Sequence, residues 1–334
     1  MKLNLCCQLL KTSLGRFSTI STRQISSNIV QKQNDIFNKE FKRQQNAVGR
    51  IEKINVTYKG LPEDAELIMN KNLSTPYNCA QHMSEMLCDR SVLALIDGVK
   101  LWDMHRPLES DCELQLLHFY DSDPYHSNRT FWRSCSIMLG SVLSNAFKDN
   151  VEVQLHSFPS PNVKSGSFVY DVQLSGVDNW KPTSAELRVL SAEMVKLAYE
   201  AVPFERLSIS QDLAEALFEH NKYKLEQIPS IVQQSIDGKV IVYRIKDHID
   251  ISRGPMMSNT NHLGRCTIAA AQQVETDAGL FYRFQGVALP KSIKLNHFAY
   301  GILEERAKKL NPGRLPGQQV EYQPTLASSE QIGA

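Results

Sequence analysis

The sequence predicts an α+β protein with two folded domains, and three observations support this. Its 334 residues are enough for about two domains at the usual ~100 to 200 residues each. Residues 51–120 combine strand patterns with a helix and a hairpin, and residues 121–310 alternate helical and strand patterns. With 42% hydrophobic and 22% charged residues the composition is globular, and no apolar run approaches the ~18 residues of a membrane span.

The N-terminus has the composition of a mitochondrial targeting segment. Residues 1–50 carry a charge of +7, which leaves −6 for the remainder of a chain whose net charge is +1. No acidic residue precedes Asp35, and Arg, Lys, Ser and Thr alternate with apolar residues. Such a segment is typical of mitochondrial import, whereas a secretory signal needs a longer apolar run. We therefore expect residues 1–27 to be a presequence and the protein to reside in the mitochondrial matrix.

Residues 28–50 form a basic polar arm that is rich in Gln, Asn, Lys and Arg. The pattern fits a solvated surface helix, and it equally fits an arm that lies along RNA phosphates. Because the rest of the chain is mildly acidic, any contact with RNA must come from local patches of this kind.

Residues 51–120 predict a small α+β domain. Thr75 has the character of a helix N-cap, with Pro76 at the first helical position. Asp97-Gly98 between two apolar runs is a strong hairpin signal. The strands are expected near 51–58, at 92–96, at 99–102 and at 112–119.

The cysteines do not indicate a metal centre or a disulfide framework. Seven of them are scattered without any Cys-x-x-Cys pair. His262 and Cys266 stand four residues apart, but two ligands do not complete a zinc shell. We expect one surface histidine and one packed thiol there, and no metal or other cofactor.

Several segments resemble threonyl-tRNA synthetase. Residues 94–98, 103–108 and 111–117 are similar to its TGS domain, a ubiquitin-like β-grasp, which would occupy residues 51–120. The similarity to its editing domain continues in unbroken order to residue 310. It runs through residues 131–140, 166–172, 186–200, 250–255 and 279–290 to a last helix at 295–309. The resemblance implies a β-grasp domain followed by an editing-like α+β domain over residues 121–310.

The residues of the editing motifs are replaced. The family builds its editing cleft from His-x-x-x-His and Cys-x-x-x-His, which position water to hydrolyse mischarged tRNA. These positions fall on Arg133, Ile137, Ser252 and Met256. Arginine stays protonated, isoleucine has no heteroatom and methionine is a weak ligand, while the serine has no base beside it in the sequence. We expect no catalytic residue here, an ordinary surface role for Arg133, and a closed apolar cleft with Met256 buried beside Ile137.

The C-terminal part is short. Only 25 residues follow residue 309, so we expect no class II catalytic core and no aminoacylation. Residues 311–334 are rich in Pro, Gly and Ser, which predicts an extended tail, held against a partner.

The combined pattern also resembles non-catalytic relatives of the synthetase in the large subunit of the mitochondrial ribosome. This resemblance implies a structural, non-enzymatic component that binds ribosomal RNA and neighbouring large-subunit proteins and supports mitochondrial translation, with no membrane or small-molecule substrate as partner. Two alternatives remain: a free-standing trans-editing deacylase for mischarged tRNA, and a mitochondrial RNA-binding or assembly factor.

Overall fold

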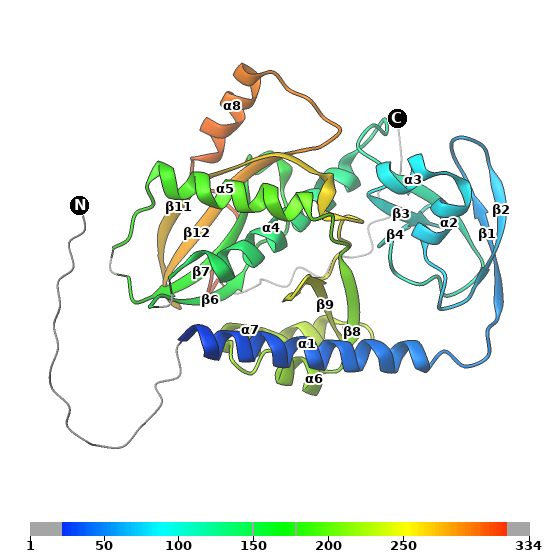
Figure 1. Cartoon of the computed structure of the whole chain (residues 1–334), viewed down its shortest axis with the longest axis horizontal. Helices are drawn as coiled ribbons and strands as arrows, with labels where there is room; N and C mark the ends of the chain where they lie inside the picture. The colour runs from blue at the N-terminus through cyan, green and yellow to red at the C-terminus, as the bar shows by residue number, and fades with distance from the viewer. Residues whose placement is uncertain (1–21, 149, 178, 319–334) are drawn as a thin grey trace, which may run out of the picture.

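The computed structural model describes residues 22–148, 150–177 and 179–318, which form three sheets (Figure 1). Each sheet has a hydrophobic core of its own. The α+β class expected from the sequence is confirmed. The expected presequence, residues 1–27, lies mostly outside the described residues, as do residues 319–334 of the expected tail.

The first domain is a β-grasp, in which five strands in the order β2-β1-β5-β3-β4 cover two short helices. Strands β1 and β5 are parallel and the other neighbours are antiparallel. Thr75 caps α2 with its hydroxyl, and Asp97 and Gly98 both have positive φ in the hairpin turn, as the sequence predicts. The elements are β1 (Lys53–Tyr58), β2 (Ala65–Asn70), α2 (Pro76–Met83), α3 (Glu85–Arg90), β3 (Leu93–Ile96), β4 (Lys100–Trp102) and β5 (Cys112–Leu117).

Strand β2 of this domain was not predicted from the sequence. It is an edge strand, and Met69 is its one buried residue. Ile68, which faces the other way, is 70% exposed. An edge strand that contributes so little to the core lacks the regular alternation by which a strand is recognised in a sequence.

The largest core lies under the four-stranded sheet β11-β12-β7-β6. Helices α4 and α5 pack on one face of this sheet, and α8 packs on the other. The last helix is slightly shorter than the expected 295–309. The elements are α4 (Tyr125–Ala146), β6 (Glu152–Ser157), β7 (Phe168–Ser175), α5 (Ser184–Tyr199), β11 (Leu263–Thr276), β12 (Gly279–Pro290) and α8 (His297–Ala307).

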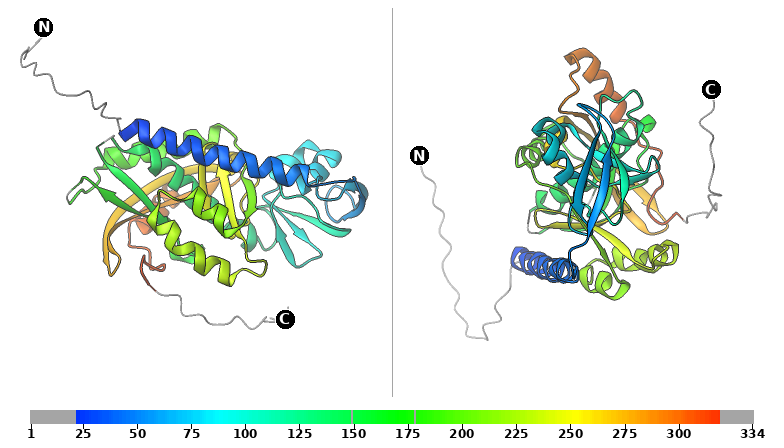
Figure 2. Two further views of the ribbon diagram at one scale, coloured as in Figure 1. Left: turned by 90° about the horizontal axis from the view of Figure 1, so that it is seen from below. Right: turned by 90° about the vertical axis from the view of Figure 1, so that its right-hand side faces the viewer.

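A third sheet, β10-β9-β8, is covered by α1, α6 and α7. Figure 2 shows α1 lying across this part of the molecule. The sheet carries the 250–256 segment at its end, because β10 leads directly into it. The elements are α1 (Thr22–Asn46), β8 (Glu205–Ile209), α6 (Gln211–Leu217), α7 (Lys222–Gln234), β9 (Val240–Ile245) and β10 (His248–Ile251).

The basic arm, residues 28–50, falls mostly in a surface helix, α1, and one face of this helix is buried rather than solvated. Phe37 is 1% exposed, and Gln33 donates a hydrogen bond to the carbonyl of Leu217. Helix α1 begins at Thr22, so the boundary expected after residue 27 falls within the helix. Its packing face was hidden in the sequence because the few apolar residues are separated by polar ones.

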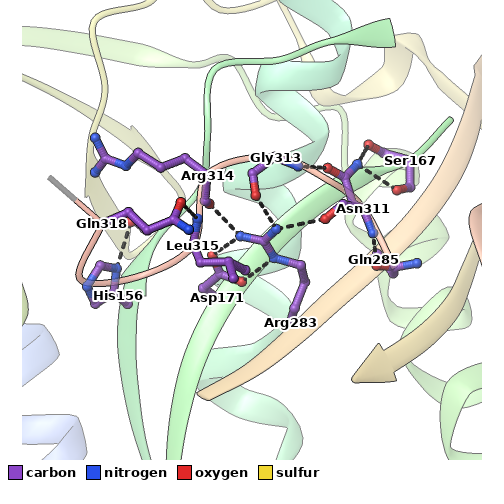
Figure 3. Close-up of polar contacts among 11 residues, drawn as sticks. His156, Ser167, Asp171, Arg283, Gln285, Asn311, Gly313, Arg314, Leu315 and Gln318 are labelled. Atoms are coloured by element: carbon purple, nitrogen blue, oxygen red, sulfur yellow. Dashed lines mark hydrogen bonds and ion pairs between the residues drawn. The ribbon is translucent and has the colours of Figure 1, made fainter. Parts of the chain in front are cut away.

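Residues 311–318, which we call the C-terminal strap, lie on the chain's own body. Figure 3 shows Arg283 at the centre of this contact. Its guanidinium makes two hydrogen bonds of 2.7 Å to Asp171 and donates to the carbonyls of Asn311, Gly313 and Arg314. Arg283 is completely buried and Asp171 is 2% exposed, so the strap completes the hydrogen bonding of a buried ion pair.

Helices long and apolar enough to cross a membrane are absent from the described part of the chain.

Arg283→Met should lower the free energy of unfolding by about 3 to 5 kcal/mol, because it leaves a buried carboxylate without its partner. Urea denaturation of the purified protein would measure this. Lys59→Met is the control: it breaks an exposed ion pair with Asp64 and should leave the unfolding midpoint nearly unchanged. If Arg283→Met changed the unfolding midpoint as little as Lys59→Met does, the contact of Arg283 with Asp171 and the strap would not be stabilising.

Candidate functional site

The four positions of the editing motifs lie on α4 and on the loop after β10. Arg133 and Ile137 are one helical turn apart on α4, and Ser252 and Met256 lie on the loop. The two segments meet, because Arg133 Nη1 donates a 3.0 Å hydrogen bond to the carbonyl of Pro255. The two segments that carry the four positions predicted from the sequence are therefore in contact.

Apolar side chains pack where α4 meets the loop after β10. Ile137 and Met256 are both completely buried and belong to the same hydrophobic core. The Ser134 hydroxyl lies 3.6 Å from the Met256 sulfur. This burial agrees with the expectation of a closed apolar cleft, because aliphatic and thioether groups pack where imidazoles would need water. A cavity of about 100 Å³ adjoins Trp132 and Ser136, and neither Arg133 nor Ser252 lines it.

Arg133 is not an ordinary surface residue, contrary to the expectation from the sequence. It is partly buried and bonded to the loop. Burial, together with the nearby Arg129, lowers the pKa of the Arg133 guanidinium to about 10. It is therefore still a cation at neutral pH and has no lone pair with which to accept a proton.

The turn in the loop is shaped by Tyr243. Gly254 has a φ of +67°, and a Cβ at this position would lie 1.9 Å from the Tyr243 hydroxyl oxygen. Only glycine fits such an approach. The Ser252 hydroxyl accepts a 3.3 Å hydrogen bond from the Gly254 N–H, so it is used in the turn.

The β-grasp domain holds the loop through Asp103. The Asp103 carboxylate accepts a 2.8 Å hydrogen bond from the Met256 N–H and bonds of 2.9 Å from the Tyr243 hydroxyl. Arg206 lies 3.7 Å away. Burial raises the pKa of Asp103, and the hydrogen bond from Met256 is the largest effect opposing that rise. The same carboxylate therefore binds the loop and the tyrosine that shapes it.

Further hydrogen bonds hold the next two residues. The Met257 N–H donates to the Ser134 hydroxyl on α4 at 2.9 Å. Ser258 is bound to the β-grasp domain: its N–H donates to the Val92 carbonyl, its hydroxyl donates to the Ser91 carbonyl, and its own carbonyl lies 3.0 Å from His105 Nε2. Residues 256–258 of the loop are thus hydrogen-bonded both to α4 and to the β-grasp domain.

His262 is buried, which corrects the expectation of a surface histidine. It is 7% exposed, and its Nε2 lies 2.6 Å from the Ser258 hydroxyl. Burial lowers the pKa of His262 to about 4. Cys266 is a packed thiol, as expected, and burial raises its pKa to about 12.

The arrangement has little capacity for acid and base chemistry. None of the four positions carries a group that can exchange a proton near neutral pH. In the ranges that the structure covers, no group of three or more His, Cys, Asp or Glu side chains is placed to hold a metal ion. What the site does offer is a set of hydrogen bonds and packed apolar groups that join two domains.

The residues that hold the loop were not predicted from the sequence. Asp103, His105 and Ser134 are distant from it in the chain, with Asp103 and Met256 separated by 153 positions. Asp103 and His105 belong to the segment that resembles a TGS domain, but nothing in their local pattern indicates a contact with another domain. Only the tertiary structure shows that contact.

Met256→Ala should lower the free energy of unfolding by about 2 to 5 kcal/mol, since it leaves a cavity in the core. Thermal and urea denaturation of the purified protein would measure the change. Met86→Ala is the matched control, because Met86 is 53% exposed and its truncation leaves no cavity. A small effect of Met256→Ala would mean that the cleft is not packed.

Acidification from about pH 6.5 to about pH 4 should destabilise the protein through His262. Its pKa is 6.5 when unperturbed and about 4 in the fold, so between these values the unfolded chain binds more protons. The contribution is roughly 3 kcal/mol, fully present above pH 6.5 and lost as the pH falls towards 4. His262→Gln should flatten the dependence of unfolding free energy on pH. An unchanged slope in His262→Gln would contradict this prediction.

Comparison with known proteins identifies relatives of the β-grasp domain and of the whole chain. Residues 61–118 match the TGS domain family. The large ribosomal subunit protein mL39 of Drosophila melanogaster is 56% identical over 318 residues, which cover 95% of each chain.

Threonine–tRNA ligases are more distant relatives. The probable threonine–tRNA ligase 1, cytoplasmic, of Dictyostelium discoideum is 34% identical over 64% of this chain and 27% of its own length. The threonine–tRNA ligase, mitochondrial 1, of Arabidopsis thaliana is 32% identical over 74% of this chain and 33% of its own length. The chain thus spans a third or less of these ligases but nearly all of the ribosomal relative. It belongs to the mL39 family of large ribosomal subunit proteins.

Proposed function

We propose that the protein is a structural component of the large subunit of the mitochondrial ribosome, where it supports mitochondrial translation. The observation that carries the proposal is the 56% identity to a large ribosomal subunit protein over 95% of both chains. The acid-free, Arg- and Ser-containing N-terminus supports the mitochondrial matrix as its location.

The protein acts without catalysing a reaction. Editing in the ligases' manner needs an acid-base group or a thiolate, and the four motif positions hold Arg133, Ile137, Ser252 and Met256. Ile137 and Met256 are both buried in one hydrophobic core, where a working cleft would have to admit water and the end of a tRNA. These features favour a structural role over that of a trans-editing deacylase.

Ribosomal RNA is one partner, and the outer face of α1 is the surface that fits it. Lys39, Lys42, Arg43 and Arg50 are all exposed. Three of them lie within one turn near the C-terminal end of the helix, and Arg50 follows shortly after it. Arg43 pairs with Glu40, whereas Lys39 and Lys42 make no ion pair with any described residue. A line of exposed cations on a firmly packed helix is suited to RNA phosphates.

The buried face of α1 keeps these cations in a defined place. Phe37 packs in the core, and the Arg244 guanidinium lies 4.2 Å from the centre of its ring. Gln44 donates a 2.7 Å hydrogen bond to the Ser208 carbonyl. The exposed cations of α1 are therefore fixed on one side of a mildly acidic protein, and this side faces RNA.

Neighbouring large-subunit proteins are the other class of partner.

The protein should sediment with the large mitochondrial ribosomal subunit and stay with it through a high-salt gradient. This is checked by gradient centrifugation of mitochondrial lysate, with detection of the tagged full chain. Free migration under all salt conditions would contradict a ribosomal role and favour the RNA-binding or assembly factor.

Replacing Lys39, Lys42 and Arg43 by Gln should lower the salt concentration at which the chain dissociates, because fewer phosphates are neutralised. Lys59→Gln and Lys100→Gln, on the β-grasp domain, serve as controls for charge alone.

A further inference from the structure

Helix α8 projects from the body of the molecule (Figure 1). Asn296 caps it, with its side chain accepting a hydrogen bond from the Ala299 N–H at 2.8 Å. Its inner side is held by Tyr300 and Ala307, which are completely buried against β11 and β12. The Tyr300 hydroxyl lies 3.1 Å from that of Thr267 on β11. The helix is therefore fixed in place on one side only.

The N-terminal half of the outer side of this helix is apolar, whereas Glu305 and Arg306 are exposed nearer its C-terminal end. Phe298 is 80% exposed and Ile302 is 56% exposed, and Leu295, just before the cap, is 42% exposed. Phe298 and Ile302 are spaced as i and i+4, which places them on one face of α8, and Leu295 lies just outside the helix beside its N-cap. We call these three residues the α8 stripe. Large apolar side chains that are exposed to water at neighbouring positions are costly and mark an interaction surface.

One end of the stripe is positively charged. Lys291 and Lys294 are exposed and make no ion pair within the described ranges. Arg265, also exposed, lies with its guanidinium 3.7 Å from the centre of the Tyr300 ring. The surface thus combines an apolar line with a cationic end.

We propose that the α8 stripe docks into an apolar groove, with an acidic rim, on a neighbouring protein of the large ribosomal subunit. This inference rests on the proposed function, which supplies an assembly of RNA and proteins around the chain. Apolar anchors one turn apart on a helix, such as Phe298 and Ile302, are part of the pattern by which a helix binds in a groove of another protein. The charge complementarity places carboxylates of the partner next to Lys291 and Lys294.

RNA is a poorer occupant for this surface. Two of the three anchors, Leu295 and Ile302, are aliphatic and offer no ring on which a base can stack. Phosphates would satisfy the lysines but would leave the apolar line against a polar backbone. A protein groove satisfies both parts of the surface at once.

The experiment places a photoreactive benzoylphenylalanine at position 298 of the full chain in mitochondria. After irradiation, the large subunit is isolated on a high-salt gradient and treated with ribonuclease. A ribonuclease-resistant crosslink to one large-subunit protein, mapped to an apolar groove, is the expected result. A crosslink to RNA, a crosslink to a second copy of the chain, or no crosslink in chains that sediment with the subunit would each overturn the proposal. Absence of the wild-type chain from the subunit would instead overturn the proposed function.

Substitutions distinguish docking into an apolar protein groove from stacking of an RNA base. Phe298→Asp with Ile302→Asp should lower the fraction that stays with the subunit at high salt by about tenfold or more, as expected for loss of central anchors. Phe298→Leu should retain binding to an apolar groove, whereas a stacked base would require an aromatic ring. Val99→Asp is the matched control, because Val99 is also 80% exposed but lies in the β3–β4 turn. Unchanged retention of the double variant, with circular dichroism equal to wild type, would contradict the proposal.

Discussion

The Asp103 carboxylate joins the two halves of this protein. It belongs to the β-grasp domain, yet its hydrogen-bond donors are the Met256 N–H and the Tyr243 hydroxyl of the following domain. A buried carboxylate is tolerated only where several donors surround it, and hydrogen bonds to charged groups contribute about 1.5 to 3 kcal/mol each. Removal of either domain would leave these groups unpaired. The position of one domain on the other therefore depends on this contact.

The same contact explains why the loop keeps the form of an active-site turn without its chemistry. Tyr243 fills the space against Gly254, Asp103 holds the tyrosine, and Met256 occupies the core below. In a cleft that works on a substrate, these volumes must be open to water. Here they are filled by side chains, so the turn contributes to packing between domains. The packed loop thus helps to make the two domains a rigid body that can be part of an assembly.

The exposed surfaces of this body differ in character. The outer face of α1 carries cations above a buried face centred on Phe37. Helix α8 presents Phe298 and Ile302 to solvent while Tyr300 fixes its inner side. Both helices are firmly packed on one side, so their free sides are held in a defined orientation. A component of a large assembly needs such pre-organised surfaces, because ordering them on binding would cost affinity.

Local chemistry made much of the fold predictable from the sequence. The Thr75 cap and the Asp97-Gly98 turn depend on neighbouring residues alone. The replaced residues at 133, 137, 252 and 256 were identified through the resemblance to threonyl-tRNA synthetase. Features that depend on distant partners were not predictable. These include the edge strand β2, the buried face of α1, the burial of His262 and the strap bound by Arg283. The sequence by itself thus determined which chemistry the chain lacks. Only the tertiary structure decided what replaced it, because burial and hydrogen bonding across 153 positions leave no local pattern.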